Sequence, residues 1–236
     1  GDPADYPKRV AGRTIDSARS FGGLVDISAE DVDLFLGDGV TLRLVPADGK
    51  LPAKHQLRLD LDDGSVLVAS VQMYGGLWAC PTGERPNNYV STAMEKPSPL
   101  CAGFDRAYFE SVMAAVPEGA SVKAALATEQ RIPGLGNGVL QDILFAARLH
   151  PKRTMATLGE REREALFDAC SRTLRAMYQA GGRDTEKLLD GKPGGYRTIL
   201  SRKTVGTPCP ICSEPIEKAS YLGGSVYFCP GCQVVG

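Results

Sequence analysis

Residues 134–151, GLGNGVLQDILFAARLHP, combine a glycine-rich turn with an apolar stripe of helical period. The stripe follows the i, i+3, i+4, i+7 spacing of one buried helix face: Leu140, Ile143, Leu144 and Ala147. The Gly-x-Gly-Asn turn before it allows backbone N–H groups at a helix start to approach a phosphate. Alone this turn is weak evidence, because a simple corner between two helices has the same composition.

The sequence on both sides of this segment is also helical in character. Residues 104–116 and 121–128 have helical composition, and residues 158–180 read as a long, charged amphipathic helix. Gly181-Gly182 follows that helix directly and is typical of a C-cap. The second half of the chain is therefore predicted to be helical.

The first hundred residues predict β-structure instead. Residues 34–44 alternate apolar and polar around a Gly-Asp-Gly turn, as in a hairpin with one buried face. Residues 57–61 repeat the alternation, and a second turn leads into residues 65–68. Several short strands of this kind indicate a sandwich or barrel. Residues 80–99 contain four prolines and little periodicity, which indicates an interdomain linker.

Four cysteines near the C-terminus have the spacing of a metal site. In TPCPICSEPIEKASYLGGSVYFCPGCQ, residues 207–233, two C-x2-C pairs flank sixteen residues: Cys209, Cys212, Cys229 and Cys232. Four thiolates close a tetrahedral shell around one structural Zn2+, and Gly223-Gly224 would turn the hairpin between the pairs. An iron–sulfur site or four unligated thiols are the alternatives. Cys170 reads as a small buried residue.

Composition limits the remaining classes. The 236 residues are 43% hydrophobic and 23% charged, as in an ordinary globular protein, and contain no apolar run that could span a membrane. Seven cysteines, four of them in metal spacing, favour a reducing cytoplasm. The first 120 residues carry a net charge of −6 and the rest +5, which points to a polyanion partner or to a solvated helical surface.

The order of these motifs resembles the formamidopyrimidine-DNA glycosylase/endonuclease VIII family. The resemblance covers at least residues 98–236, and the β half fits it less closely. It runs from the Gly-x-Gly-Asn helix through GGRDTEKLLDGKPGGY (181–196) and Arg202-Lys203 to the paired cysteines. It implies an α+β, two-domain fold. We expect a β-sandwich domain, incomplete at its start, over residues 1–80 and a linker over 81–100. A helical domain with a helix–two-turn–helix should cover 101–203, and a zinc finger 204–236.

By resemblance, the protein is a base-excision-repair DNA glycosylase and AP lyase that binds damaged or abasic double-stranded DNA as a monomer in a bacterial-type cytoplasm. Such enzymes flip a damaged base out of the duplex. The resemblance implies that Gly136 and Asn137 hold phosphate and that Tyr74 acts as an aromatic wedge. A core tyrosine is the alternative for Tyr74. Basic contacts with DNA are expected from Lys54, His55, Arg202 and Lys203.

The chain also departs from the family pattern. The N-terminal Pro-Glu that carries catalysis in the family is not matched, so the catalytic residues are unknown. A family lysine falls near Gly22, and the arginine of the zinc hairpin falls at or near Gly224. We therefore expect either an enzyme whose catalytic segment is missing from this sequence, or a non-catalytic DNA-binding relative. A zinc-ribbon protein-interaction module is the third hypothesis.

Overall fold

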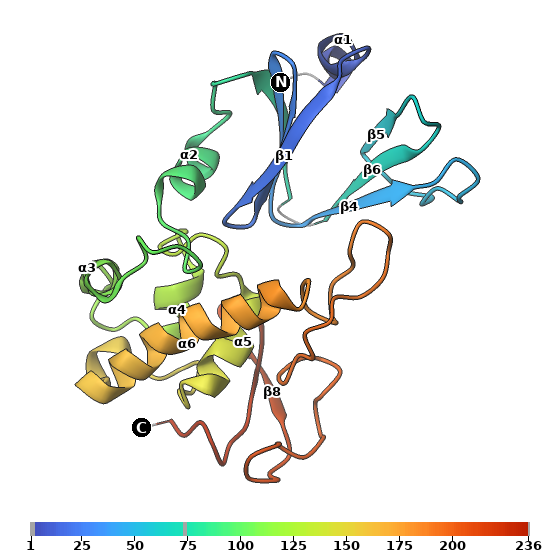
Figure 1. The fold of residues 1–236 in the computed structure, drawn as a ribbon. Helices are drawn as coiled ribbons and strands as arrows, with labels where there is room; N and C mark the ends of the chain where they lie inside the picture. Colours follow the sequence, from blue (N-terminus) through green and yellow to red (C-terminus); the bar gives the residue numbers. More distant parts are fainter. Residues whose placement is uncertain (1–2, 73–74, 236) are drawn as a thin grey trace. The chain divides into compact units, whose positions relative to one another are not determined.

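A computed structural model describes residues 3–72 and 75–235, which form two compact units. The first unit comprises residues 1–95 and 186–193, and the second comprises 96–185 and 194–236. The predicted α+β architecture is confirmed, with β-sheets in the first unit and helices followed by a cysteine-bearing hairpin in the second (Figure 1). None of the helices in the described residues is long and apolar enough to cross a bilayer.

The first unit contains two antiparallel sheets. One has the strand order β1-β2-β3-β7 and the other β4-β6-β5. The strands are β1 (Ile15–Phe21), β2 (Leu24–Ala29), β3 (Val32–Leu36), β4 (Val40–Val45), β5 (Leu57–Asp60), β6 (Val66–Val71) and β7 (Leu77–Pro81). A short 3-10 turn (Pro3–Asp5) and α1 (Tyr6–Val10) precede them.

The two central strands of the first sheet, β2 and β3, are buried on both faces, whereas β1 at its edge is exposed. Alternate residues such as Ile27, Leu34 and Leu36 pack toward the second sheet, where they meet Leu67 and Ala69. The opposite face, which includes Leu24, Phe35 and Cys80, packs against helix α2 (Asn88–Glu95). This double burial explains why every residue of β3 is buried, the aspartate included.

Two expectations about this unit need revision. Residues 34–44 do not form a hairpin, because β3 pairs with β2 and β7, whereas β4 pairs with β6 in the other sheet. The expected pairing of residues 57–61 with 65–68 is present as β5 and β6. The proline-rich stretch 80–99 contains the end of β7 and the whole of α2, so part of it is regular structure.

The second unit is built around α5 (Asn137–Ala146), which packs along α6 (Glu160–Gln179) in Figure 1. The other helices are α3 (Arg106–Ala114), α4 (Val122–Ala127) and a 3-10 turn (Met155–Thr157). The stripe predicted from the sequence is buried: Leu140, Ile143, Leu144 and Ala147 all lie in the core cluster. Helix α6 ends at two glycines with positive φ, and the Gly182 N–H donates to the Met177 carbonyl, which confirms the predicted C-cap.

The hairpin of β8 (Glu217–Tyr221) and β9 (Gly224–Phe228) completes this unit. It packs against α5 and the loop that follows that helix. His150 in this loop is buried, with its ring edge-on to Phe228 at a centroid distance of 4.5 Å. Its Nδ1 accepts a hydrogen bond from the Lys152 N–H at 3.2 Å, which requires a neutral nitrogen at that position.

Burial of His150 predicts acid-dependent stability. Burial, and secondarily the charge of Lys152, lowers the pKa of His150 below 6.5. The unfolded state therefore binds a proton more readily, so the free energy of unfolding should fall as pH drops below about 6.5. We expect His150→Gln to show a smaller difference in stability between pH 7.5 and pH 5.5, measured by urea unfolding. His55→Gln, which alters the only other histidine, is the matched control and should keep the wild-type difference.

Candidate metal centre and phosphate-binding helix terminus

The four cysteines predicted as metal ligands lie together. Their sulfur atoms are all within 4.8 Å of one another: Cys209, Cys212, Cys229 and Cys232. The Sγ atoms of Cys209 and Cys232 are 3.8 Å apart, and those of Cys212 and Cys229 are 3.3 Å apart. A tetrahedral shell with Zn–S bonds of about 2.3 Å has edges of about 3.8 Å. The cluster therefore has the composition and size to hold one metal ion of this kind.

The surroundings of the sulfurs suit a structural metal. Cys209 Sγ accepts a hydrogen bond from the Ile211 N–H at 3.4 Å, as thiolate ligands of such knuckles do. Burial raises the pKa of the Cys232 thiol to about 12, so the protein alone disfavours the thiolate there. A bound cation would supply the opposite charge and stabilise the thiolate form. The site thus couples metal binding to loss of protons.

Gln233, which the sequence reasoning did not single out, anchors the second knuckle. Its buried side-chain oxygen accepts from the Cys229 N–H, and its nitrogen donates to the Leu149 carbonyl, both at 2.9 Å. These bonds join the knuckle to the loop after α5. Its position directly after the last cysteine is the only sequence signal that could have identified it.

The turn before α5 has the geometry expected of an anion site. Gly134 has φ +85°, and Gly136 is the extended N-cap residue, with no side-chain cap on the helix. Gly134, Gly136 and Asn137 are all exposed. The first N–H groups of a helix have no intrahelical partner, and the helix dipole adds positive potential there. This terminus therefore presents donors to solvent.

Asn137 is shared between this terminus and the hairpin. Its Nδ2 donates to the Ser225 carbonyl at 3.0 Å. Gln141, one turn later and buried, donates to the Asn137 carbonyl at 2.9 Å and accepts from the Tyr227 N–H at 3.1 Å. The hydrogen bond to Ser225 orients the side-chain amide of Asn137. Because an amide nitrogen has two hydrogens, one N–H of Asn137 remains able to donate to a ligand.

Lys123 in α4 is a further polar residue of this region that the sequence reasoning missed. It is only 5% exposed, and its Nζ donates to the Tyr221 carbonyl of the hairpin at 2.6 Å. Burial lowers the pKa of Lys123. Among the residues that the structure describes, Lys123 forms no ion pair, so no carboxylate neutralises the charge of its ammonium group. A buried lysine near the start of a short helix has no distinctive sequence pattern.

Gly224 stands where the resemblance places a family arginine. A Cβ atom built on Gly224 would lie 3.5 Å from Asn137 Nδ2 and 3.6 Å from Lys123 Nζ. Two nitrogen donors thus converge on the space beside this glycine. Lys123 brings a positive charge to that space from α4, although the hairpin itself contributes no side chain.

The other predicted DNA-binding residues are more dispersed. Arg202 and Lys203 are exposed in the second unit, where Lys203 Nζ donates to the Asp184 carbonyl at 3.0 Å. Lys54 and His55 belong to the first unit, in the loop before β5, and Lys54 is exposed. Tyr74 lies outside the described residues. The roles of these residues remain predictions.

Asp142, one position after Gln141, anchors the backbone of the segment at residues 199–200 to α5. Its two carboxylate oxygens accept from the Ile199 N–H at 2.9 Å and the Leu200 N–H at 2.8 Å. Burial raises the pKa of Asp142, and these hydrogen bonds act in the opposite sense. The helix that carries Asn137 therefore also holds the segment leading to Arg202 and Lys203.

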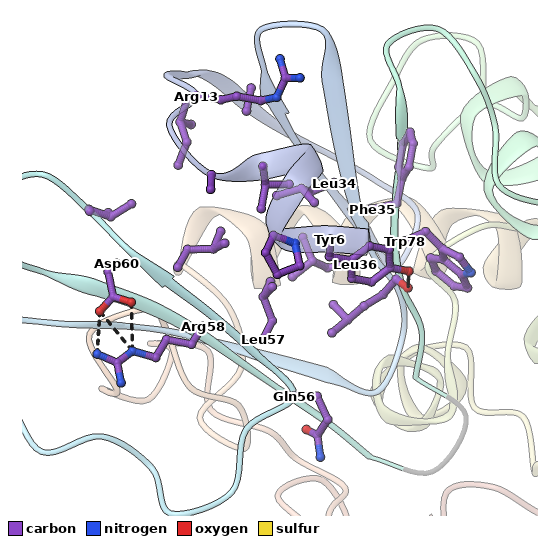
Figure 2. A pocket seen from close by; sticks show the side chains of 18 of the residues that line it. Tyr6, Arg13, Leu34, Phe35, Leu36, Gln56, Leu57, Arg58, Asp60 and Trp78 are labelled. Atoms are coloured by element: carbon purple, nitrogen blue, oxygen red, sulfur yellow. Dashed lines mark hydrogen bonds and ion pairs between the residues drawn. The ribbon is translucent and has the colours of Figure 1, made fainter. Parts of the chain in front are cut away.

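A separate cavity of about 790 Å3 lies in the first unit (Figure 2). Its walls are mainly apolar side chains of both sheets and of α1, including Leu34, Leu36 and Leu57. Arg58 and Asp60, the charged pair drawn with dashed lines, satisfy each other at 2.6 Å. Of the sequence-predicted site residues that the structure describes, none lines this cavity.

Comparison with known proteins places these features in a family. The formamidopyrimidine-DNA glycosylase H2TH domain matches residues 96–187. The formamidopyrimidine-DNA glycosylase of Geobacter sulfurreducens is 30% identical over 239 residues, covering 98% of this chain and 86% of the relative. The chain belongs to the formamidopyrimidine-DNA glycosylase family. The Desulforamulus reducens enzyme of the same name is 29% identical over 214 residues, 85% of this chain and 76% of that one.

Solved structures of the family share the fold. The MutM (Fpg) protein of Thermus thermophilus superposes with a TM-score of 0.80 at 25% identity, covering 98% of this chain and 89% of its own. The Lactococcus lactis Fpg bound to abasic-site DNA gives a TM-score of 0.82 at 21% identity, covering 98% and 86%. Family membership thus agrees with the resemblance read from the sequence.

The cysteine cluster predicts a defined metal content. We expect about one Zn per chain by elemental analysis, since four thiolates close one tetrahedral shell. Chelation should lower the thermal midpoint markedly, because structural Zn2+ contributes about 10–16 kcal/mol of binding energy in small zinc modules. Cys232→Ser should lose the metal and the added stability. Cys101→Ser, which changes an exposed cysteine of the same unit, is the control and should retain both. A metal-free protein with an unchanged midpoint would contradict this assignment.

Proposed function

We propose that this protein is a base-excision-repair protein of the DNA glycosylase class that binds damaged or abasic double-stranded DNA through its second unit. The observation that carries the proposal is the convergence of Asn137, Lys123 and the open start of α5 beside Gly224. No residue of the described structure is assigned a catalytic role.

The helix terminus supports contact with a DNA phosphate. Its unpartnered N–H groups and positive dipole end favour an anion, as in other phosphate sites at helix starts. Asn137 lies at the first helical position, and its amide is oriented by the Ser225 carbonyl. The site is therefore preorganised, and the phosphate would bind without a large ordering cost.

Lys123 supports the same assignment through charge. Its ammonium is held by the Tyr221 carbonyl and the ring of Tyr221, whose centroid lies 5.8 Å away. Keeping an ammonium buried without a carboxylate is costly, and a phosphate beside Gly224 would offset that cost. The proposal thus explains a polar arrangement that stability alone does not require.

The zinc module has a supporting role in this proposal. One structural Zn2+ at the four cysteines would hold the knuckles at the base of the hairpin, close to the apolar cluster around Phe145. Because α5 and the hairpin together frame the phosphate site, the metal would maintain the site without contacting DNA itself. The relatives' names and the DNA-bound structures of Lactococcus lactis Fpg support this function for the chain.

Affinity for a duplex carrying a central abasic-site analogue tests the proposal. We expect tight binding that weakens as salt rises, with a slope of about −0.9 per phosphate neutralised by a lysine or arginine in a plot of log K against log salt. Asn137→Ala should weaken binding about tenfold or more, because a hydrogen bond to a charged group contributes about 1.5–3 kcal/mol. Lys123→Met should also reduce the salt slope by about one, whereas Asn137→Ala should leave the slope nearly unchanged.

The matched control is Asn88→Ala. Asn88 is also an exposed asparagine at the first position of a helix, α2, but it belongs to the first unit. Its substitution should leave DNA affinity and salt slope unchanged. Thermal midpoints and zinc content of the Asn137 variant separate lost binding from lost folding. Salt-independent or absent duplex binding would favour the protein-interaction hypothesis instead.

A further inference from the structure

The tip of the zinc hairpin contains an unusual residue. The two-residue turn between Tyr221 and Gly224 consists of Leu222 and Gly223, whose φ angles are +49° and +71°. The sequence had placed this turn one residue later, at Gly223-Gly224. Two-residue hairpin turns with positive φ at both positions strongly prefer Asn-Gly, Asp-Gly or Gly-Gly. A branched leucine in the left-handed region is strained.

Leu222 is also exposed to solvent. Its side chain is 54% exposed, and in the described part of the chain it belongs to none of the apolar clusters. A leucine at this position therefore combines backbone strain with exposed apolar surface, and neither stabilises the fold. Backbone strain that does not stabilise the fold is typical of functional positions.

The rest of the hairpin is braced so that Leu222 is held outward. On one strand, the Tyr221 carbonyl accepts a hydrogen bond from Lys123 Nζ. The Nζ atoms of Lys123 and Lys152 also lie over the Tyr221 ring, 5.8 and 5.6 Å from its centroid. On the other strand, Asn137 and Gln141 bind the Ser225 carbonyl and the Tyr227 N–H. Both strands are thus tied to the helices, and the tip cannot fold back without breaking these bonds.

Charge around the tip identifies the kind of partner. A single exposed leucine buries too little surface for a stable protein interface. Two lysines lie over the ring of Tyr221, the residue before Leu222, and the phosphate site proposed above is on the same hairpin. An apolar wedge flanked by cations is the arrangement with which proteins enter the minor groove and partly unstack a base step.

From this geometry we propose that Leu222 is a wedge that inserts into the minor groove of bound duplex DNA and unstacks a base step. The proposal rests on the DNA-binding function proposed above. Lys123 and Lys152 would hold the backbone on either side, and the strained turn would project the isobutyl group toward the bases. Leu222 contributes no reacting group; its role is to deform the duplex.

The decisive variant is Leu222→Asn, because asparagine suits the turn but cannot act as an apolar wedge. We expect its thermal midpoint to rise, since the left-handed backbone is no longer strained. Its affinity for the abasic-analogue duplex should fall about tenfold. 2-Aminopurine placed at successive positions of that duplex should show one step whose fluorescence increase on binding is lost in Leu222→Asn. Leu222→Met, which keeps an apolar side chain, should retain this increase.

Val235→Asn is the matched control. Val235 is another apolar residue of the second unit with a similar exposure, 60%, but it lies after the last cysteine and not at the tip. This variant should bind and unstack DNA as the wild type does.

The outcomes separate the two proposals. If Leu222→Asn binds and unstacks the duplex like the wild type while Asn137→Ala is impaired, the wedge is wrong and the DNA-binding function stands. If the wild type binds no duplex, both are overturned. A lowered midpoint for Leu222→Asn, or equal loss of unstacking in Leu222→Met, would also contradict the wedge.

Discussion

The side chain of Gln141 joins the two parts on which the candidate site depends. Its amide links the first turn of α5 to the Tyr227 N–H of β9 from a fully buried position. The hairpin is a two-stranded ribbon, and an isolated ribbon of this kind is marginally stable in water. It therefore needs the helix, and the proposed phosphate site beside Gly224 exists only while the two are joined. Gln233 and the four cysteines provide the same support at the base of the hairpin.

The buried side chains of Asp142 and Gln141 both have structural partners in this unit. Asp142 accepts two backbone N–H groups, and Gln141 satisfies groups on both the helix and the strand. Lys123 differs, because its ammonium is buried against a carbonyl and an aromatic ring and no carboxylate neutralises it. Asp142 and Gln141 thus stabilise the fold, whereas the charge of Lys123 remains available to an anion. It is the electrostatic basis for the function proposed here.

Much of the architecture follows from the sequence. The period-3.6 stripe identified α5 and its buried face, and the cysteine spacing identified four sulfurs that lie together. Strand pairing could not be predicted in the same way. Alternation shows which face of residues 34–44 is buried, but it does not show that β3 and β4 belong to different sheets. Helix α2 was overlooked because Pro86 and Pro97 bracket residues 88–95 without interrupting them.

By itself the sequence determined the class of fold and the four cysteines of the candidate metal site, because these depend on periodicity and spacing along the chain, and the order of its motifs resembled the family. Only the tertiary structure decided that Lys123 joins Asn137 beside Gly224 and that Leu222 occupies the strained tip of the hairpin. Lys123 and Tyr221, whose carbonyl it contacts, are 98 residues apart in the chain. Such contacts are set by how helices and strands pack, and no local pattern records them.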